Sequence, residues 1–228
     1  FDAYRNTELY ASNFELVSKE LTSVNLGYTK LPIPFLEDRT KLASFNFYHN
    51  RFPSTTVNTS DDHKDTFFNS GTESTGYTAY KFNLCTALTI INCYNSNIKG
   101  PLPSFNTNPQ LETIDIRNTN IYGGDQGVAK NDQQYVISSN VFLGCTKLKS
   151  FYMSSKTIAK GTNSNDPTLI VDGIQSNAFA DTVSLVNLVI DTRNQVRGRI
   201  PSLSSLSNLE SLDLEGNKFS GSMPSFVS

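Results

Sequence analysis

Apolar residues recur along the chain in the pattern L-x-x-L-x-L-x-x-(N/T/S)-x-L, in which other apolar residues can replace leucine. Seven windows fit, and their leading residues are Leu21, Leu42, Leu88, Leu111, Leu148, Leu185 and Leu209. Positions 4 and 6 of a window lie two residues apart, so in a strand their side chains point to the same side. One strand cannot bury that side, whereas stacked parallel strands can. The pattern predicts a parallel sheet of about seven strands, with Leu188 pointing inward in the sixth.

The leading leucines are separated by 21, 46, 23, 37, 37 and 24 residues. The short spacings match repeats of roughly 20–29 residues. The long spacings contain polar, glycine-rich segments, which we expect to be loop insertions near residues 55–80, 123–139 and 160–172. Such loops are tolerated because the entropy of closing a loop grows slowly with its length. Residues 21–228 are therefore expected to form one repeat array with insertions.

Two further motifs accompany the windows. A glycine- and proline-containing shape follows three strands, at Ile98–Pro103, Val196–Pro201 and Phe219–Pro224. An F-x-x-(C/T)-x-x-L unit precedes three strands, at Phe82–Leu88, Phe142–Leu148 and Phe179–Leu185.

With these motifs the chain resembles leucine-rich repeat proteins. The first motif resembles the L-x-G-x-I-P unit of plant-type repeats, and the second resembles the A-F-x-x-C-x-x-L unit of bacterial and protozoan surface proteins. The resemblance implies a solenoid of the α/β class dominated by β-structure. It implies a parallel sheet on the concave face, with loops and short helical turns on the other. Lys156 and Arg193 stand at position 9, where the family has an inward polar residue, so we expect those two repeats to turn differently.

The first 20 residues follow a different pattern, with apolar residues at near-helical spacing from Leu9 to Leu21. We expect residues 1–20 to be an N-terminal helical cap or the helical end of a preceding repeat. The chain begins at Phe1 and ends at Ser228 inside the pattern, so we expect it to be a fragment of a longer chain, with further chain or neighbouring subunits at the C-terminal edge.

Composition excludes several partner classes. Lys and Arg number 19 against 21 Asp and Glu, which gives a net charge of −2 and argues against nucleic-acid binding. No run approaches the roughly 18 apolar residues of a membrane span, so no membrane insertion is expected. Asn, Ser and Thr make up roughly a third of the chain, a composition common in extracellular and virion-associated β-proteins.

The cysteines and histidines predict no cofactor or metal. Cys85 and Cys145 occupy the same repeat position with one repeat between them, which places them about 10 Å apart at the strand step. A disulfide needs Cα atoms within about 7 Å, so we expect buried thiols that form no disulfide, with Cys93 replacing a core leucine. Neither His49 nor His63 lies at metal-ligand spacing, and residues 61–65 lack the glycine-centred spacing of a calcium loop.

The odd positions of each window point away from the core, and together with position 8, which adds Tyr28 and His49, they carry the candidate site. Tyrosine, asparagine and one arginine gather there in the first five windows, and Tyr and Arg are favoured at binding hot spots. The candidate ligand-binding residues are Tyr48, His49, Asn92, Tyr94, Asp115, Arg117 and Tyr152. The alternative is that these side chains are only the polar outer surface that any such sheet needs.

The last two windows carry Asp191, Asp213 and Glu215 on the same face. Asp191 and Glu215 are expected about 5 Å apart, the carboxylate separation of a retaining glycosidase. An open sheet face does not raise a carboxylate pKa by burial, and no catalytic motif is present, so we expect no enzymatic activity.

Two hypotheses follow. The first is a non-enzymatic recognition or adhesion module on a cell or virion surface, which binds a protein or glycan through the exposed sheet face in an extracellular setting. The alternative is a structural interaction module within a viral, phage or surface assembly. In either case the insertion at residues 55–80 could fold over the face and carry the site instead.

Overall fold

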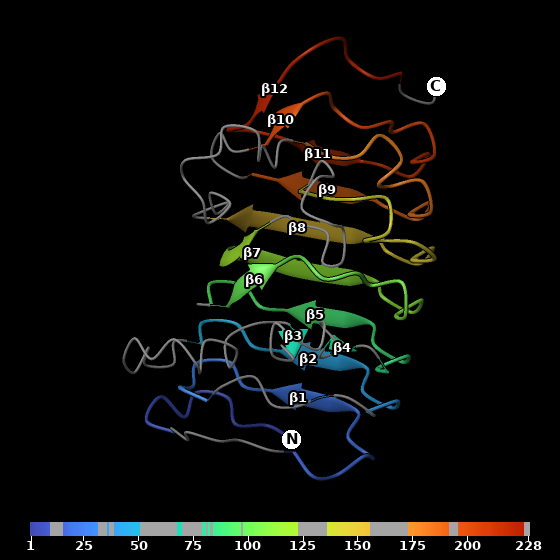
Figure 1. Cartoon of the computed structure of the whole chain (residues 1–228). Coiled ribbons are helices and arrows are strands. Elements are labelled where there is room, and N and C mark those ends of the chain that lie inside the picture. Colours follow the sequence, from blue (N-terminus) through green and yellow to red (C-terminus); the bar gives the residue numbers. More distant parts are fainter. Residues whose placement is uncertain are drawn as a thin grey trace, which may run out of the picture.

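The protein is described from a computed structural model, in which the stacked coils run from the N-terminus at one end to the C-terminus at the other (Figure 1). The described residues are 1–9, 16–31, 36, 39–50, 68–69, 79–80, 82, 84–96, 98–122, 136–155, 173–191 and 196–225. The expected insertions at 55–80, 123–139 and 160–172 lie largely outside this part of the chain.

One parallel sheet forms a wall of the solenoid. Its strands, in spatial order, are β1 (Ser23–Asn25), β2 (Ser44–Asn46), β5 (Ile90–Asn92), β7 (Thr113–Tyr122), β8 (Ser150–Ser155), β9 (Asn187–Ile190) and β11 (Ser211–Asp213). Position 4 of every window is in register with the next: Val24, Phe45, Ile91, Ile114, Phe151, Leu188 and Leu212. The predicted seven-stranded parallel sheet is confirmed.

One short strand adds to this sheet, and two further pairs form small separate sheets. β6 (Lys99–Pro101) runs parallel to the end of β7. β10 (Arg197–Gly198) pairs in parallel with β12 (Lys218–Phe219). β3 (Phe68–Asn69) and β4 (Ala79–Tyr80) form an antiparallel pair within the first expected insertion.

The core follows the predicted alternation. Positions 4 and 6 are fully or almost fully buried in the first six windows, from Val24 and Leu26 through to Leu188 and Ile190. Phenylalanine rings stack along the interior: Phe105 lies 6.1 Å and Phe179 5.5 Å from Phe142, between ring centroids. In the seventh window Leu212 and Leu214 are only partly buried, because no described strand follows β11 in the sheet.

The wall opposite the sheet is made of turns. The expected short helical turns are wrong for the described residues, none of which is helical. Each F-x-x-C-x-x-L unit instead forms two consecutive turns: the Cys85 N–H donates to Phe82 O, and the Leu88 N–H donates to Cys85 O, both at 3.0 Å. The same pair of turns occurs at Leu36–Arg39–Leu42, Phe105–Asn108–Leu111 and Leu203–Leu206–Leu209. The motif is therefore more widespread than its cysteines suggest.

Position 9 supplies buried hydrogen bonds. The Asn50 amide donates to Leu26 O at 3.1 Å and to the Thr29 hydroxyl at 2.7 Å. Ser96 and Thr119 each donate to a carbonyl three residues earlier, both at 2.8 Å. Lys156 and Arg193, for which we expected different turns, lie outside the described residues.

The cysteines behave as predicted. All three are buried and form no disulfide. The Cys85 thiol donates to Leu36 O at 3.2 Å, and the Cys145 thiol donates to Phe105 O at 3.3 Å. The thiols of Cys85 and Cys145 therefore bond to the backbone of the preceding coil.

The N-terminal residues add a coil rather than a helix in the part described. Asp2 bridges Asn25 in parallel, Ala3 is 3% exposed, and turns follow at Tyr4–Arg5. Residues 10–15, the middle of the expected helix, lie outside the described residues, while 1–9 and 16–20 contain no helical residue. Among the described residues, no helix is long and apolar enough to span a membrane.

Candidate functional site

A left-handed residue follows β1, β2 and β5, and another lies inside β7, where the pairing with β8 shifts register between Arg117 and Thr119. Position 8 has positive φ at Tyr28 (56°), His49 (52°), Asn95 (53°) and Asn118 (54°), and Arg5 (60°) takes the same place in the additional coil. Asparagine tolerates this conformation, whereas bulky side chains adopt it rarely. Histidine also adopts it more often than most residues, so Tyr28 and Arg5 hold the most strained backbone on the face that carries the candidate site, and such strain tends to cluster at functional positions.

Position 5 stabilises the same turn. The Oδ1 atom of the position 5 side chain accepts the backbone N–H of position 7, at 3.2 Å for Asn92 and Tyr94 and at 3.1 Å for Asp115 and Arg117. The equivalent bonds link Asp2 with Tyr4, Asn25 with Gly27 and Asp213 with Glu215. Asn92 and Asp115, which we predicted as ligand-binding residues, thus each have one acceptor atom occupied in a turn.

Aromatic side chains of positions 7 and 8, together with Arg117 at position 7 and Tyr152 at position 5, form a continuous row on the outer face of the sheet. We call this set the aromatic row: Tyr4, Tyr28, Tyr48, His49, Tyr94, Arg117 and Tyr152. Ring centroids are 5.9 Å apart for Tyr4 and Tyr28, 4.6 Å for Tyr28 and His49, and 5.2 Å for His49 and Tyr94. The Arg117 guanidinium carbon then lies 5.4 Å from the Tyr94 ring centroid and 4.7 Å from that of Tyr152. Side chains from six coils are therefore linked without a break.

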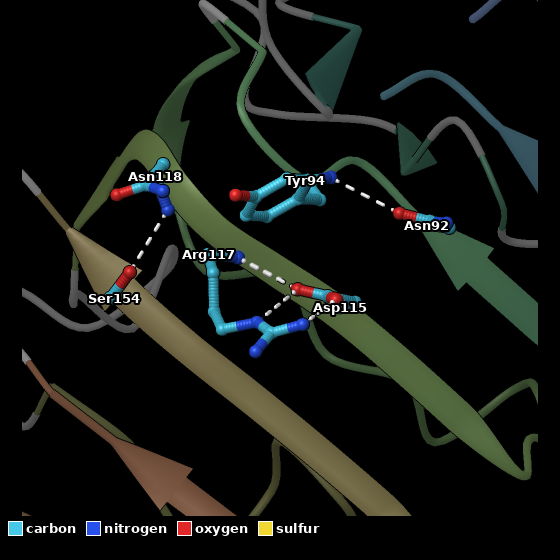
Figure 2. Close-up of polar contacts among 6 residues, drawn as sticks. All are labelled: Asn92, Tyr94, Asp115, Arg117, Asn118 and Ser154. Carbon is cyan, nitrogen blue, oxygen red and sulfur yellow. Dashed lines mark hydrogen bonds and ion pairs between the residues drawn. The ribbon is translucent and has the colours of Figure 1, made fainter. Parts of the chain in front are cut away.

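Arg117 is held in place by Asp115. Its Nε donates to Oδ1 at 3.0 Å and its Nη2 donates to Oδ2 at 2.6 Å, so the guanidinium and the carboxylate form a two-bond pair (Figure 2). The hydrogen bond to Asp115 raises the pKa of Arg117 above its ordinary value, against the opposing effect of partial burial. The Asp115 side chain is 13% exposed and that of Arg117 is 41% exposed. One edge of the guanidinium is fixed, and the rest of it remains accessible.

The other end of the row is packed more tightly. The Tyr48 ring lies over Gly27, where a Cβ atom would come within 2.9 Å of Tyr48 Cζ. Burial, together with Tyr4, raises the pKa of the Tyr48 phenol. The side-chain amide nitrogen of Asn95 and Nδ1 of His49 form a hydrogen bond of 2.7 Å, which ties neighbouring coils together.

The structure brings the seven predicted residues onto one face, and each of them contacts another member directly. The sequence interpretation missed Tyr4 and Asn95. Tyr4 could have been found by extending the position 7 column one coil toward the N-terminus, and Asn95 by its place in the position 8 column beside His49. That these residues bind a ligand stays a prediction.

Of the acidic residues of the last coils, Asp213 ends β11 and pairs in register with Val189, while Asp191 directly follows β9. The Asp213 carboxylate accepts the Glu215 backbone N–H at 2.9 Å. Among the described residues, no three or more His, Cys, Asp or Glu side chains gather as metal ligands would.

Comparison with known proteins places the fold. Residues 208–228 match the family described as Leucine Rich Repeat. No curated protein matches the chain. The structure of PEPR1–AtPEP1 is similar over 93% of this chain, with 23% identity and a TM-score of 0.61. The leucine-rich repeat ectodomain of the Arabidopsis thaliana receptor kinase GASSHO1/SCHENGEN3 is similar over 92%, with 20% identity and a TM-score of 0.57.

A third structure is the functional domain of InlJ from Listeria monocytogenes. The similarity covers 87% of this chain and 35% of the InlJ chain, with 15% identity and a TM-score of 0.46. The chain spans 24% of the PEPR1 structure and 21% of the GASSHO1/SCHENGEN3 structure. The protein thus has the fold of a leucine-rich repeat solenoid, and a repeat of that family is present at residues 208–228.

Proposed function

We propose that the protein is a non-enzymatic recognition module that binds a polypeptide through the aromatic row. The observation that carries this proposal is the unbroken chain of contacts from Tyr4 to Tyr152 along one edge of the sheet. Tyr and Arg bury much area on binding and keep polar tips, which makes them common anchors at interfaces. Two structures of similar fold also support it: PEPR1 was solved with AtPEP1, and the GASSHO1/SCHENGEN3 ectodomain with CASPARIAN STRIP INTEGRITY FACTOR 2.

Ring orientation favours a polypeptide over a glycan. Sugars pack on the open faces of aromatic rings, but here one face of each of four rings is engaged within the row. Tyr28 and His49 stack on each other with planes 9° apart, and Arg117 covers a face of Tyr94 and of Tyr152. The row therefore presents ring edges, hydroxyl groups and guanidinium N–H groups, which suit the mixed apolar and amide surface of a polypeptide.

The setting we propose is extracellular, at a cell or virion surface, with adhesion as one use of the module. The ectodomain of similar fold and the abundance of Asn, Ser and Thr support this setting. We also keep the proposal that plant-type and surface-type repeats are mixed in this chain. The F-x-x-C units support it, since both of their cysteines bond to the backbone of the preceding coil.

A second candidate is a structural module within a larger assembly. The observation that favours it is the end of the sheet at β11, where Leu212 in the strand, Leu214 just after it and Phe219 are only partly buried. Unpaired strand edges are ready templates for pairing with another chain. If this candidate holds, the protein associates through β11 with neighbouring subunits, and sedimentation detects an association that replacing Leu214 by Lys abolishes.

The first proposal is tested with random linear peptides displayed on phage and selected on the wild-type protein. We expect the double variant Tyr94→Ala/Arg117→Ala to weaken binding of the selected peptides by at least about tenfold. The melting temperature should change little, because partly exposed ion pairs contribute only about 0–1 kcal/mol. Lys149→Ala is the matched control, since it removes an exposed ion pair with Glu112 at the opposite ends of the strands.

Two outcomes would contradict the proposal. If the double variant binds the selected peptides normally and deletion of residues 58–76 abolishes binding, the site lies on the insertion. If the wild-type protein binds glycans on an array but yields no peptide, the row recognises sugars after all.

A further inference from the structure

Arg117 in the aromatic row is paired with the Asp115 carboxylate, and this pairing narrows the chemistry of the ligand group that Arg117 can bind. We infer that Arg117 binds an uncharged acceptor, an amide carbonyl of the bound polypeptide, and that Asp115 sets this preference against carboxylates. The inference rests on the proposed function, because it names the ligand chemistry of that same face.

The geometry leaves one direction of approach. Nε and Nη2 of Arg117 donate to Asp115, and the rings of Tyr94 and Tyr152 pack against the guanidinium. A guanidinium has five N–H groups in one plane. The two N–H groups of Nη1 and the second one of Nη2 donate to no described residue, and the side chain is 41% exposed. An acceptor can therefore reach Arg117 in the guanidinium plane, on the edge away from Asp115 (Figure 2).

The local charge decides which acceptor is favoured. Asp115 is 13% exposed and receives two hydrogen bonds from the Arg117 side chain and one from its backbone, so its carboxylate directly faces the cation. The pair therefore carries no net charge. At positions 5 and 7 of the two neighbouring strands, the residues are Asn92, Tyr94, Tyr152 and Ser154, all uncharged at neutral pH.

A ligand carboxylate at the open edge would be attracted by Arg117 and repelled by Asp115 a few ångströms further away. It would also lose much of its hydration between the two rings, a cost that is repaid only when the charge finds an uncompensated partner. An amide carbonyl accepts the same N–H groups with neither penalty. A guanidinium whose charge is already compensated thus acts as a fixed donor for neutral acceptors.

The variant Asp115→Asn removes the negative charge at residue 115 while nearly preserving the shape of the side chain. The asparagine side chain can still accept the backbone N–H of residue 117, as Asn92 does for Tyr94 at 3.2 Å. The carboxylate is lost, so Arg117 becomes an uncompensated cation. Asp213→Asn is the matched control, because Asp213 makes the same turn with Glu215 at 2.9 Å and no ion pair of Asp213 is present among the described residues.

The experiment uses peptides selected on the wild-type protein and counter-selected on Arg117→Ala, so that every probe depends on Arg117. Each peptide is synthesised in an amide form and a carboxylate form. The two forms differ by Gln or Glu, by Asn or Asp, or by an amidated or free C-terminus. Kd values are measured for the wild type, Asp115→Asn and Asp213→Asn. We expect the wild type to bind amide forms about tenfold more tightly at the position that contacts Arg117, with Asp115→Asn cancelling or reversing this preference and Asp213→Asn preserving it.

The outcomes are distinguishable. If Arg117-dependent peptides bind the wild type better as carboxylates, or if the preference persists in Asp115→Asn, the inference is wrong while peptide recognition stands. If selection yields no peptide that depends on Arg117, the proposed function fails at this subsite and the inference fails with it.

Discussion

Tyr28 and His49 stack face to face across neighbouring coils, with ring centroids 4.6 Å apart and ring planes 9° apart. Both residues have left-handed backbone, with φ of 56° and 52°. This conformation costs roughly 1–2 kcal/mol for a residue with a Cβ. The same conformation carries both side chains to the edge of the sheet, where they join Tyr4 and Tyr94. The strain is thus coupled to the assembly of the aromatic row.

The backbone at His49 provides the first prediction. His49→Asn should change the free energy of unfolding by less than about 1 kcal/mol, because asparagine tolerates positive φ and stands at the same position in the next two coils, as Asn95 and Asn118. His49→Val should destabilise by about 1–2 kcal/mol more than His49→Asn, since a β-branched residue is disfavoured there. Urea denaturation measures both. Equal stability of the two variants would show that the strand does not end in a left-handed turn.

The second prediction concerns the core. Leu188 is 1% exposed and pairs in register with Phe151 and Leu212. Leu188→Ala should destabilise by about 2–5 kcal/mol, the usual cost of deleting a buried leucine side chain. Val189→Ala is the control, because Val189 points to the outer face and is half-buried. A larger loss for Val189→Ala would mean that the strand is shifted by one residue, since such a slip reverses every side chain.

The third prediction concerns alkaline pH. Burial, and secondarily Asp181, raises the pKa of the Cys145 thiol from 9.0 to about 12. The folded state therefore holds the thiol proton where the unfolded chain releases it. The stability that Cys145 contributes is complete below pH 9.0 and is lost as pH rises toward 12, by up to about 1.4 kcal/mol per pH unit.

Denaturation of the wild type and of Cys145→Thr over this pH range tests the prediction. Threonine already occupies the same place in the next coil, where the Thr182 hydroxyl donates to Phe179 O at 2.9 Å. The wild type should lose stability relative to Cys145→Thr as pH rises above 9, and the folded thiol should resist alkylation. Parallel pH profiles for the two proteins would show that Cys145 titrates normally.

The sequence predicts the sheet well because strand register follows the alternation of apolar and polar residues, and each window contains this alternation. Leu21 to Leu209 mark every strand of the main sheet, and the buried pairs such as Val24 and Leu26 follow from them. The turns opposite the sheet are harder to predict. The same double turn is built around Cys85, Asn108 and Arg39, whose side chains have little in common. Only the inward Phe or Leu on either side is shared, so a search for cysteine finds a minority of the turns.

The sequence predicts the candidate site as a set of outward-pointing residues. The structure shows in addition which of their side chains contact one another. Spacing alone places Asp115 and Arg117 on one face. It does not show that they form a two-bond pair, because that depends on side-chain conformations fixed by Tyr94 and Tyr152. The N-terminal coil was missed because apolar spacing from Leu9 onward suggested a helix, while the informative residues Asp2 and Tyr4 are polar or aromatic.

The last prediction concerns Gly27, the residue beneath the Tyr48 ring. A Cβ atom at this position would lie 2.9 Å from Tyr48 Cζ, closer than side-chain packing permits, so Gly27→Ala should displace the ring. The contact involves the far end of a side chain, so the free energy of unfolding should change by no more than about 1 kcal/mol. The Tyr48 pKa is raised mainly by burial, and displacement should lower it toward 10.0. Ultraviolet titration measures this shift, with Tyr48→Phe identifying the transition; an unchanged Tyr48 pKa in Gly27→Ala would show that the ring does not rest on Gly27.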